Sequence, residues 1–241
     1  MIQGQKKIEK KKVNKEYYDV YFKSNKYIKL ADIKSSFQKY RISKILQIYT
    51  PNKEESILDL GCGWGTFCFA LAPLCKAVIG VDFNQKGIDL CNRLLDKWKS
   101  GNIKFLCSDA QNTGLKSNSF DVIICADLFE HLYPDTFGNV LDECNRLLKK
   151  GGKLIIWTPH RGHILEILKN NNIILSKEEG HVDYKSMDYL IKNLHNRKFL
   201  IKKSYYAESH IPIFCIIERC FLNILPIMRR RIAILAEKLI D

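Results

Sequence analysis

Two acidic residues and a run of glycines have the types and the spacing of a ligand-binding loop. The stretch Ile57-Leu58-Asp59-Leu60-Gly61-Cys62-Gly63-Trp64-Gly65 begins as an apolar strand, and a helical pattern follows it. Alternate glycines allow a tight turn and let the backbone approach a ligand where a Cβ atom would intrude. A second apolar strand ends at Asp82, 21 residues after Gly61. This interval is close to the ~20 residues at which a carboxylate binds the ribose hydroxyls of a nucleotide.

Two features argue against a dinucleotide as the ligand. Thr66 stands where G-x-G-x-x-G has its third glycine, and Asp59 would repel a pyrophosphate but attract an ammonium group. The pattern D-x-G-x-G-x-G resembles motif I of the class I S-adenosylmethionine-dependent methyltransferases. The resemblance implies that S-adenosylmethionine is the cofactor, that Asp59 accepts a hydrogen bond from its amine, partly through water, and that Asp82 binds its ribose. The backbone would approach the cofactor at Gly61, Gly63 and Gly65.

The adenine end of the cofactor is also implied by this resemblance. Phe83 would flank the ring, and the third strand ends at Ser108-Asp109-Ala110, which resembles the adenine-binding corner of the family. Asp109 would accept a hydrogen bond from the exocyclic amine, with Ala110 beside it. An aspartate after a strand is also a common turn former, and this alternative stays open.

The segment that follows the fourth strand resembles small-molecule methyltransferases, the group that includes the ubiquinone-biosynthesis O-methyltransferases. Those enzymes contact the cofactor through an alanine at the position of Ala126 and through an arginine about as far from the glycine loop as Arg41, which lies 20 residues before Gly61. The resemblance covers roughly residues 35–160 and is specific for the cofactor rather than for the methyl acceptor. The sequence lacks the N/D-P-P-Y/F and Pro-Cys motifs that indicate base or amide methylation.

Candidate catalytic residues follow the same strand. Asp127, Glu130 and His131 would share one face of a helix at spacings of three and four residues. His131 would act as general base on an acceptor hydroxyl, with Asp127 as its catalytic companion. A divalent ion is the alternative, as the resemblance to the quinone enzymes suggests, although we predict no metal ligands, and Asp127-x-x-Glu130 is also a capping box. Of the later histidines, His181 is the favoured catalytic member over His160 and His163.

The order of elements predicts an α/β protein. Strands are expected near 56–60, 77–82, 103–108, 120–125 and 153–158, and helices near 65–74, 85–99 and 136–149. Further segments near 186–196, 199–201 and 231–237 favour a helix and two more strands. The expected fold is a Rossmann-like seven-stranded, mostly parallel sheet with an antiparallel last strand and helices on both faces. We divide the chain into a basic flexible tail (1–15), a helical cap (16–55) and a cofactor-binding domain (56–241) with an apolar insert (211–230).

Amino-acid composition indicates the cellular environment of the protein and the classes of partner that it could bind. The chain has 241 residues, a formal charge of +13 and nine cysteines with no C-x-x-C pair, which favours a reduced, cytoplasmic protein without structural zinc. The basic tail keeps an RNA methyltransferase open as an alternative, and a non-catalytic S-adenosylmethionine-fold binding protein is a second one. A small-molecule acceptor is the preferred partner, and nucleic acid is the less favoured one.

An apolar segment near the end of the chain suggests where such an acceptor binds. Residues 211–231 are rich in Ile, Phe and Leu and end in three arginines, yet Glu218, Arg219 and Pro226 interrupt them too often for a bilayer span. An apolar segment next to cations suits a membrane interface. We expect a lid over a lipophilic acceptor that touches membrane; an extra core helix or a dimer contact is the alternative.

Overall fold

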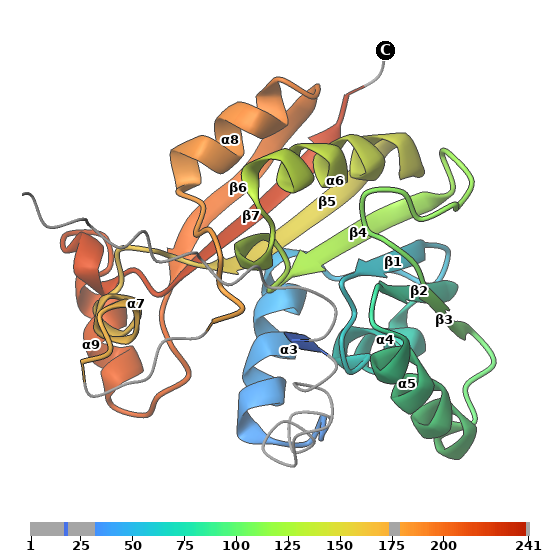
Figure 1. Cartoon of the computed structure of the whole chain (residues 1–241), viewed down its shortest axis with the longest axis horizontal. Coiled ribbons are helices and arrows are strands. Elements are labelled where there is room, and N and C mark those ends of the chain that lie inside the picture. Colours follow the sequence, from blue (N-terminus) through green and yellow to red (C-terminus); the bar gives the residue numbers. More distant parts are fainter. Residues whose placement is uncertain (1–16, 19–31, 174–178, 240–241) are drawn as a thin grey trace, which may run out of the picture.

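A single mixed sheet organises the protein. The computed structural model describes residues 17–18, 32–173 and 179–239, and in this part of the chain seven strands form one sheet in the order β3-β2-β1-β4-β5-β7-β6 (Figure 1). The strands are β1 (Ser56–Leu60), β2 (Ala77–Asp82), β3 (Ile103–Cys107), β4 (Phe120–Ala126), β5 (Leu148–Pro159), β6 (Phe199–Ala207) and β7 (Arg231–Lys238).

The direction of the strands confirms the predicted fold class. Strands β1 to β5 are parallel to one another, whereas β7 is antiparallel to both of its neighbours, β5 and β6. Because the parallel strands all end at the same edge of the sheet, the residues that follow β1, β2, β3, β4 and β5 gather there. This is the edge at which the candidate site residues lie.

Helices cover both faces of the sheet (Figure 1). One face carries α3 (Ser36–Ile48), α4 (Thr66–Leu71) and α5 (Gln85–Trp98), and the other carries α6 (Pro134–Leu147) and α8 (Met187–His195). Side chains alternate between two cores, as β geometry requires: Ile57 packs with α3 and α4, whereas Leu58 packs with α6 and α8. Both residues are fully buried.

Two predicted helices end earlier than expected. The segment 65–74 divides into α4 and a short 3₁₀ turn, Ala72–Leu74, because Pro73 cannot donate the backbone hydrogen bond that would continue an α-helix. The helix expected over 136–149 ends at Leu147, and Leu148 already pairs with Phe120 as the first residue of β5.

The chain between β6 and β7 contains the predicted apolar insert. It forms α9 (Phe214–Phe221) and the 3₁₀ turn η4 (Pro226–Met228), and α7 (Ile164–Asn170), which follows β5, lies beside α9 at the left of Figure 1. We refer to these elements together as the α7–α9 end. The predicted basic tail, 1–15, and most of the cap before residue 32 lie outside the described residues.

Candidate active site

The glycine loop leaves open space at one of its three glycines. All three have a positive φ: 79° at Gly61, 51° at Gly63 and 70° at Gly65. A Cβ atom at Gly61 would come within 2.9 Å of Leu128, and one at Gly65 within 2.9 Å of Phe105, whereas none of the described residues lies within 4 Å of a Cβ at Gly63. The loop is therefore packed against protein at two glycines, whereas at Gly63 it meets none of the residues that the structure describes.

Asp82 lies directly across from this glycine. Its Oδ2 accepts a hydrogen bond from the Gly63 N–H at 3.0 Å, and its Oδ1 accepts one from the Asn84 N–H at 2.9 Å. Burial raises the pKa of Asp82. A carboxylate has about four acceptor positions, so hydroxyl donors such as those of a ribose can bind the same two oxygens. The loop and the carboxylate thus fit a nucleoside.

Substitution of Asp82 tests whether its carboxylate binds the ribose hydroxyls. Asp82→Asn retains one acceptor oxygen for two backbone amides, and we expect it to weaken S-adenosylhomocysteine binding about 10- to 100-fold, the value of one or two charged hydrogen bonds. Asp89→Asn, which changes an exposed carboxylate on α5, is the matched control. Equal affinities of the two variants in calorimetric titrations would contradict the assignment.

Asp59 is more completely buried than we expect of a residue that binds the amine of the cofactor. Its side chain is 1% exposed, and its Oδ2 accepts a hydrogen bond from the Cys68 thiol at 3.4 Å. Burial raises the pKa of Asp59 to about 7. A nearby ammonium group would favour the ionised form, so contact with a methionine amine, direct or through water, stays a prediction.

The residues predicted for the adenine end lie after β2 and β3. Phe83 is 40% exposed and packs edge-on against Tyr18, with ring centroids 5.1 Å apart. Asp109 forms a turn: its Oδ1 accepts a hydrogen bond from the Gln111 N–H at 2.8 Å. The alternative turn role of Asp109 is therefore present, and the adenine contacts of Asp109, Ala110 and Phe83 stay predictions.

Asp127 is clamped between two arginines. Its Oδ2 accepts hydrogen bonds from Arg41 at 2.9 and 2.7 Å, and its Oδ1 pairs with Arg231. Burial alone would raise the pKa of Asp127, but Arg231 and Arg41 lower it to about 2. Because both oxygens of this carboxylate are engaged by arginines, the structure favours a positioning role for Asp127 over direct catalysis.

The local backbone also differs from the predicted helix. Asp127 has a φ of 54°, and only Phe129–His131 form a short 3₁₀ helix, whose N-cap is Leu128. The shared helix face and the capping box are therefore wrong: the chain turns sharply at Asp127 so that its carboxylate meets the arginines. Ala126, just before this turn, is buried at the end of β4.

Glu130, His131 and His181 come together from two segments. The rings of His131 and His181 are 4.9 Å apart, and potential ligand atoms of the three residues lie within 4.8 Å of one another. Burial and the nearby Asp127 charge raise the pKa of Glu130 to about 8. Burial and the neighbouring His131 lower the pKa of His181 to about 3, so its imidazole is neutral at physiological pH.

This cluster suits either of the chemistries left open by the sequence. A neutral imidazole such as that of His181 can accept a proton from an acceptor hydroxyl, and a carboxylate with two imidazoles is also a donor set for a divalent ion. By contrast, His163 is buried against Glu218, with Nε2 and Oε1 2.6 Å apart, and the Nδ1 of His160 lies 3.1 Å from the Arg229 carbonyl oxygen. The structure thus brings His181, rather than the other two, to His131.

Several residues of the site were missed from the sequence. Arg231 pairs with Asp127 from β7, more than 100 residues away, and Tyr184 and Glu166 contact the neighbourhood of His181. Of these residues, the sequence drew attention only to Arg231, as the last of three consecutive arginines, and we interpreted these arginines as cations at a membrane interface. Tyr18, which belongs to the predicted helical cap, packs edge-on against His131, with ring centroids 6.0 Å apart.

The sheet order, the glycine loop after β1 and the acidic end of β2 agree with the predicted resemblance to class I methyltransferases. Residues 58–156 match the family described as a methyltransferase domain, so the chain contains such a domain. The predicted recognition is confirmed, and the match agrees with S-adenosylmethionine as the predicted cofactor.

Curated relatives match about half of the chain. A ubiquinone biosynthesis O-methyltransferase from Coxiella burnetii is 35% identical over 109 residues, which are 45% of each chain. An uncharacterized protein from Methanocaldococcus jannaschii is 30% identical over 125 residues, 52% of this chain and 50% of that protein. The chain thus spans about half the length of these relatives.

Solved structures share the fold over most of the chain. The PH0226 protein from Pyrococcus horikoshii OT3 superposes with a TM-score of 0.67 at 21% identity and covers 92% of this chain and 98% of that chain. The N-methyltransferase NodS from Bradyrhizobium japonicum WM9, in complex with S-adenosyl-L-homocysteine, gives a TM-score of 0.66 at 15% identity, covering 92% and 97%.

Proposed function

We propose that this protein transfers a methyl group from S-adenosylmethionine to a small, lipophilic, hydroxyl-bearing molecule. The observation that carries the proposal is the hydrogen bond between the Gly63 N–H and the buried carboxylate of Asp82 at the carboxyl edge of the sheet, where a Cβ at Gly63 would meet none of the described residues within 4 Å. The methyltransferase-domain match and the similarity to ubiquinone biosynthesis O-methyltransferases support it.

Different residues would serve the cofactor end and the acceptor end of the proposed site. S-adenosylmethionine, when bound, supplies an electrophilic methyl group. The loop at Gly61 to Gly65 and Asp82 hold the nucleoside, and Arg41 borders the same loop through its guanidinium, 4.8 Å from the Phe67 ring centroid. Fixing both reactants in line accounts for much of the expected rate, because it removes the entropy cost of their encounter.

Residues at the acceptor end would remove the proton of the acceptor hydroxyl. An acceptor hydroxyl beside His131 and His181 could transfer its proton to a neutral imidazole as the methyl group is received. Asp127 would hold Arg41 and Arg231 in place rather than take this proton, given its ionic contacts. His131 itself is oriented by the Gly180 carbonyl oxygen, 2.8 Å from its Nδ1.

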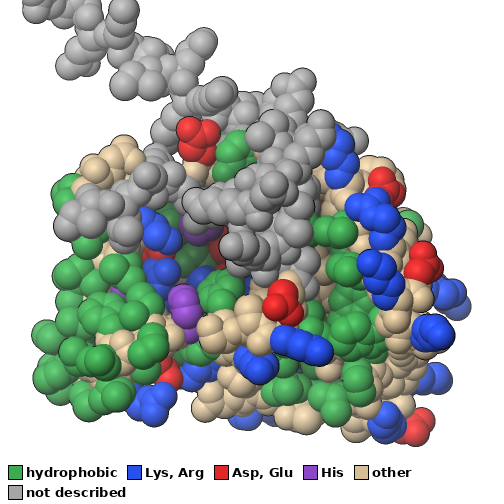
Figure 2. Space-filling view, turned by 90° about the horizontal axis from the view of Figure 1, so that it is seen from below, with side chains coloured by type: hydrophobic (Ala, Val, Ile, Leu, Met, Phe, Trp, Pro, Cys, Tyr) green, Lys and Arg blue, Asp and Glu red, His purple; other side chains and the backbone are tan. Residues whose placement is uncertain are grey.

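The α7–α9 end supports a lipophilic acceptor and contact with a membrane surface. Ile213, Ile216 and Ile224 are 74%, 61% and 72% exposed, and hydrophobic side chains gather over this end in Figure 2. No helix in the described part of the chain is long and apolar enough to cross a bilayer. Side chains of this kind beside Arg219 suit the interface of an anionic membrane.

Polar anchors fix this insert to the rest of the protein. Glu218 is fully buried on α9, where it binds His163 at the start of α7 and accepts a hydrogen bond from the Ser209 N–H. Arg219 binds Glu208 at 2.7 Å. The insert therefore presents its polar side inward and its apolar side outward, which favours a surface contact over the alternative of an extra core helix.

Transfer of labelled methyl groups tests the function. The protein is incubated with labelled S-adenosylmethionine and a cell extract, which is then separated into lipid, RNA and small-molecule fractions. We expect the label in the lipid or small-molecule fraction, with Asp82→Ala as the background. Label confined to RNA would support the alternative RNA methyltransferase, and no label above background would support a non-catalytic binding protein.

Removal of exposed isoleucines tests the membrane contact. We expect the triple variant Ile213→Ser, Ile216→Ser, Ile224→Ser to bind anionic liposomes at least about tenfold more weakly, because each isoleucine contributes up to ~1.5–3 kcal/mol when buried. Its unfolding midpoint should stay unchanged, since all three side chains are exposed. Leu200→Ser, on the edge strand β6, is the control. Unchanged liposome binding in a sedimentation assay would exclude the proposed contact.

A further inference from the structure

The part of the chain just after His181 is hydrogen-bonded to the segment that carries His131. The backbone N–H groups of Val182 and Asp183 donate to the Glu130 carbonyl oxygen at 2.9 and 3.2 Å. Lys185, only 2% exposed, donates to the carbonyl oxygens of Phe129 and Leu132 at 3.3 and 2.8 Å. This part of the chain is therefore held as firmly as a regular element, so the orientation of the His181 ring has a structural basis.

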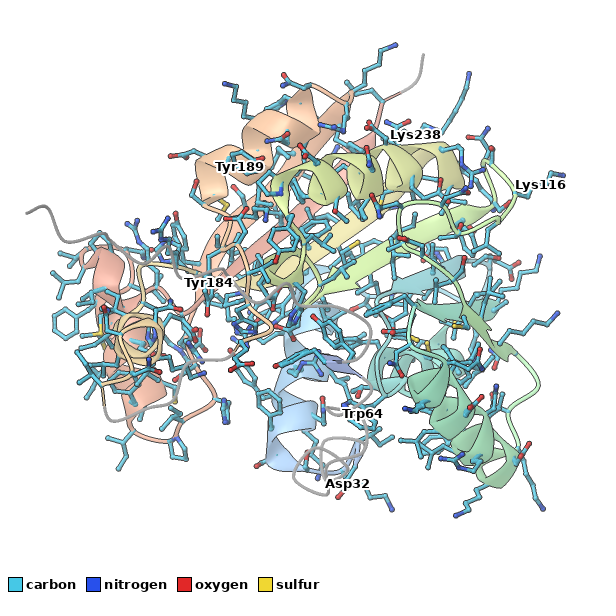
Figure 3. The ribbon with its side chains drawn as sticks, viewed as in Figure 1. Asp32, Trp64, Lys116, Tyr184, Tyr189 and Lys238 are labelled. Atoms are coloured by element: carbon cyan, nitrogen blue, oxygen red, sulfur yellow. The ribbon has the colours of Figure 1, made fainter. Side chains whose placement is uncertain are left out.

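Three further side chains continue from His181 towards the insert. The Nδ1 of His181 lies 2.8 Å from the Tyr184 hydroxyl, and this hydroxyl donates to Glu166 Oε2 at 2.6 Å. The other oxygen of Glu166 pairs with Arg230, at the end of the insert. We call His181, Tyr184, Glu166 and Arg230 the relay. Figure 3 shows Tyr184 on the loop before α8, whereas Tyr189 lies on α8 itself.

The direction of each hydrogen bond in the relay follows from Glu166. Its side chain is 1% exposed, and although burial alone would raise its pKa, Arg230, the Tyr184 hydrogen bond and Lys169 lower it to about 2. An ionised carboxylate only accepts hydrogen bonds, so the Tyr184 proton points to Glu166. The Tyr184 oxygen then presents lone pairs to His181, and the Nδ1 of His181 must carry the proton.

We propose that Tyr184 and Glu166 are positioning residues that fix the Nδ1–H tautomer of His181 and leave Nε2 as its proton-accepting nitrogen. Arg230 holds Glu166 and so connects the insert to this arrangement. The use of Nε2 as a base rests on the proposed methyltransferase function, whereas the tautomer itself does not. A group that orients an imidazole through its second nitrogen is a recurring way to make the first one effective.

Two substitutions change the relay without removing its shape. Tyr184→Phe deletes the hydroxyl. Glu166→Gln keeps one oxygen for Arg230 and turns an NH₂ group towards Tyr184, whose own proton must then point to His181. We therefore expect Glu166→Gln to reverse the tautomer, so that Nε2 carries the proton, and Tyr184→Phe to yield a mixture. Tyr189→Phe, an exposed tyrosine on the adjacent helix, is the matched control.

Nitrogen NMR of protein labelled at histidine, assigned with His181→Gln, measures the tautomer in the protein without ligands. We expect Nδ1–H for the unchanged protein and for Tyr189→Phe, and Nε2–H for Glu166→Gln. The proposal is overturned if His181 has the Nε2–H form in the unchanged protein, or keeps Nδ1–H in folded Glu166→Gln and Tyr184→Phe.

Kinetics separate this proposal from the proposed function. If the unchanged protein transfers methyl groups, kcat of Glu166→Gln should fall at least about tenfold with little change in the KM for S-adenosylmethionine, as expected for a misdirected base. A reversed tautomer with undiminished kcat would overturn the positioning role. A protein that shows the predicted tautomers but no methyl transfer would contradict the proposed function and leave the tautomer assignment supported.

Discussion

Gly63→Ala should abolish the stabilisation of the protein by S-adenosylhomocysteine, the product that the cofactor leaves after methyl transfer, while leaving the fold intact. An added methyl group meets no described atom within 4 Å, so it would project into the space that we assign to the cofactor. The positive φ costs about 1–2 kcal/mol for alanine. At S-adenosylhomocysteine concentrations near 100 times Kd, we expect the unfolding midpoint of the unchanged protein to rise by about 5–10 °C. For Gly63→Ala the rise should be below about 1 °C.

Gly114→Ala is the matched control for this experiment. Gly114 has a φ of 71°, and a Cβ there also meets none of the described residues within 4 Å, but it lies in the loop between β3 and β4 and not in the glycine loop. Both variants should lose a similar amount of stability without ligand. If S-adenosylhomocysteine stabilises Gly63→Ala as much as Gly114→Ala, Gly63 does not face the cofactor.

Asp127→Asn should destabilise the protein by about 2–4 kcal/mol at neutral pH. Asparagine tolerates the positive φ of this position, so the substitution removes the charge and keeps the backbone. The loss combines the shift of the Asp127 pKa, which corresponds to about 2 kcal/mol, with the two arginines left unpaired. Urea unfolding at pH 7 measures it, and Asp96→Asn, an exposed carboxylate on α5, should change stability by less than about 0.5 kcal/mol.

The ion pairs of Asp127 with Arg41 and Arg231 also predict how the stability of the protein depends on pH. Because the folded-state pKa of Asp127 is lowered to about 2, its contribution is complete above the unfolded value near 4. It is lost as the pH falls from about 4 to 2. The difference in unfolding free energy between the unchanged protein and Asp127→Asn should therefore shrink over this interval. A difference that stays constant from pH 7 to 2.5 would show that Asp127 is not held by its arginines.

The cofactor half of the site was predictable because its residues are local. Gly61 follows β1 directly, Asp82 is the last residue of β2 and Asp109 lies two residues after β3, so the order of strands and helices is enough to place them at one edge of the sheet. The predicted positions of β1, β2 and β4 agree with the observed ones because runs of buried apolar residues mark strands that are covered on both faces, whereas β5 begins at Leu148, five residues before the predicted start. The ends of helices α4, at Leu71, and α6, at Leu147, were less clearly indicated by the sequence.

The acceptor half depends on contacts between distant segments. Arg41 and Arg231 approach Asp127 from α3 and β7, and no spacing in the sequence indicates that a carboxylate after β4 will be shared between them. A helical pattern suggested one face for Asp127, Glu130 and His131, but the positive φ of Asp127 breaks it. His181 was predicted as catalytic, while its partners Tyr184 and Glu166 carried no recognisable motif.

Calorimetric titration with S-adenosylmethionine and with NAD tests the central claim most directly. The account predicts that S-adenosylmethionine binds at one site per chain and that NAD gives no heat of binding under the same conditions, because Asp59 and Thr66 replace the features that favour a pyrophosphate. Binding of NAD in preference to S-adenosylmethionine, or binding of neither, would contradict it.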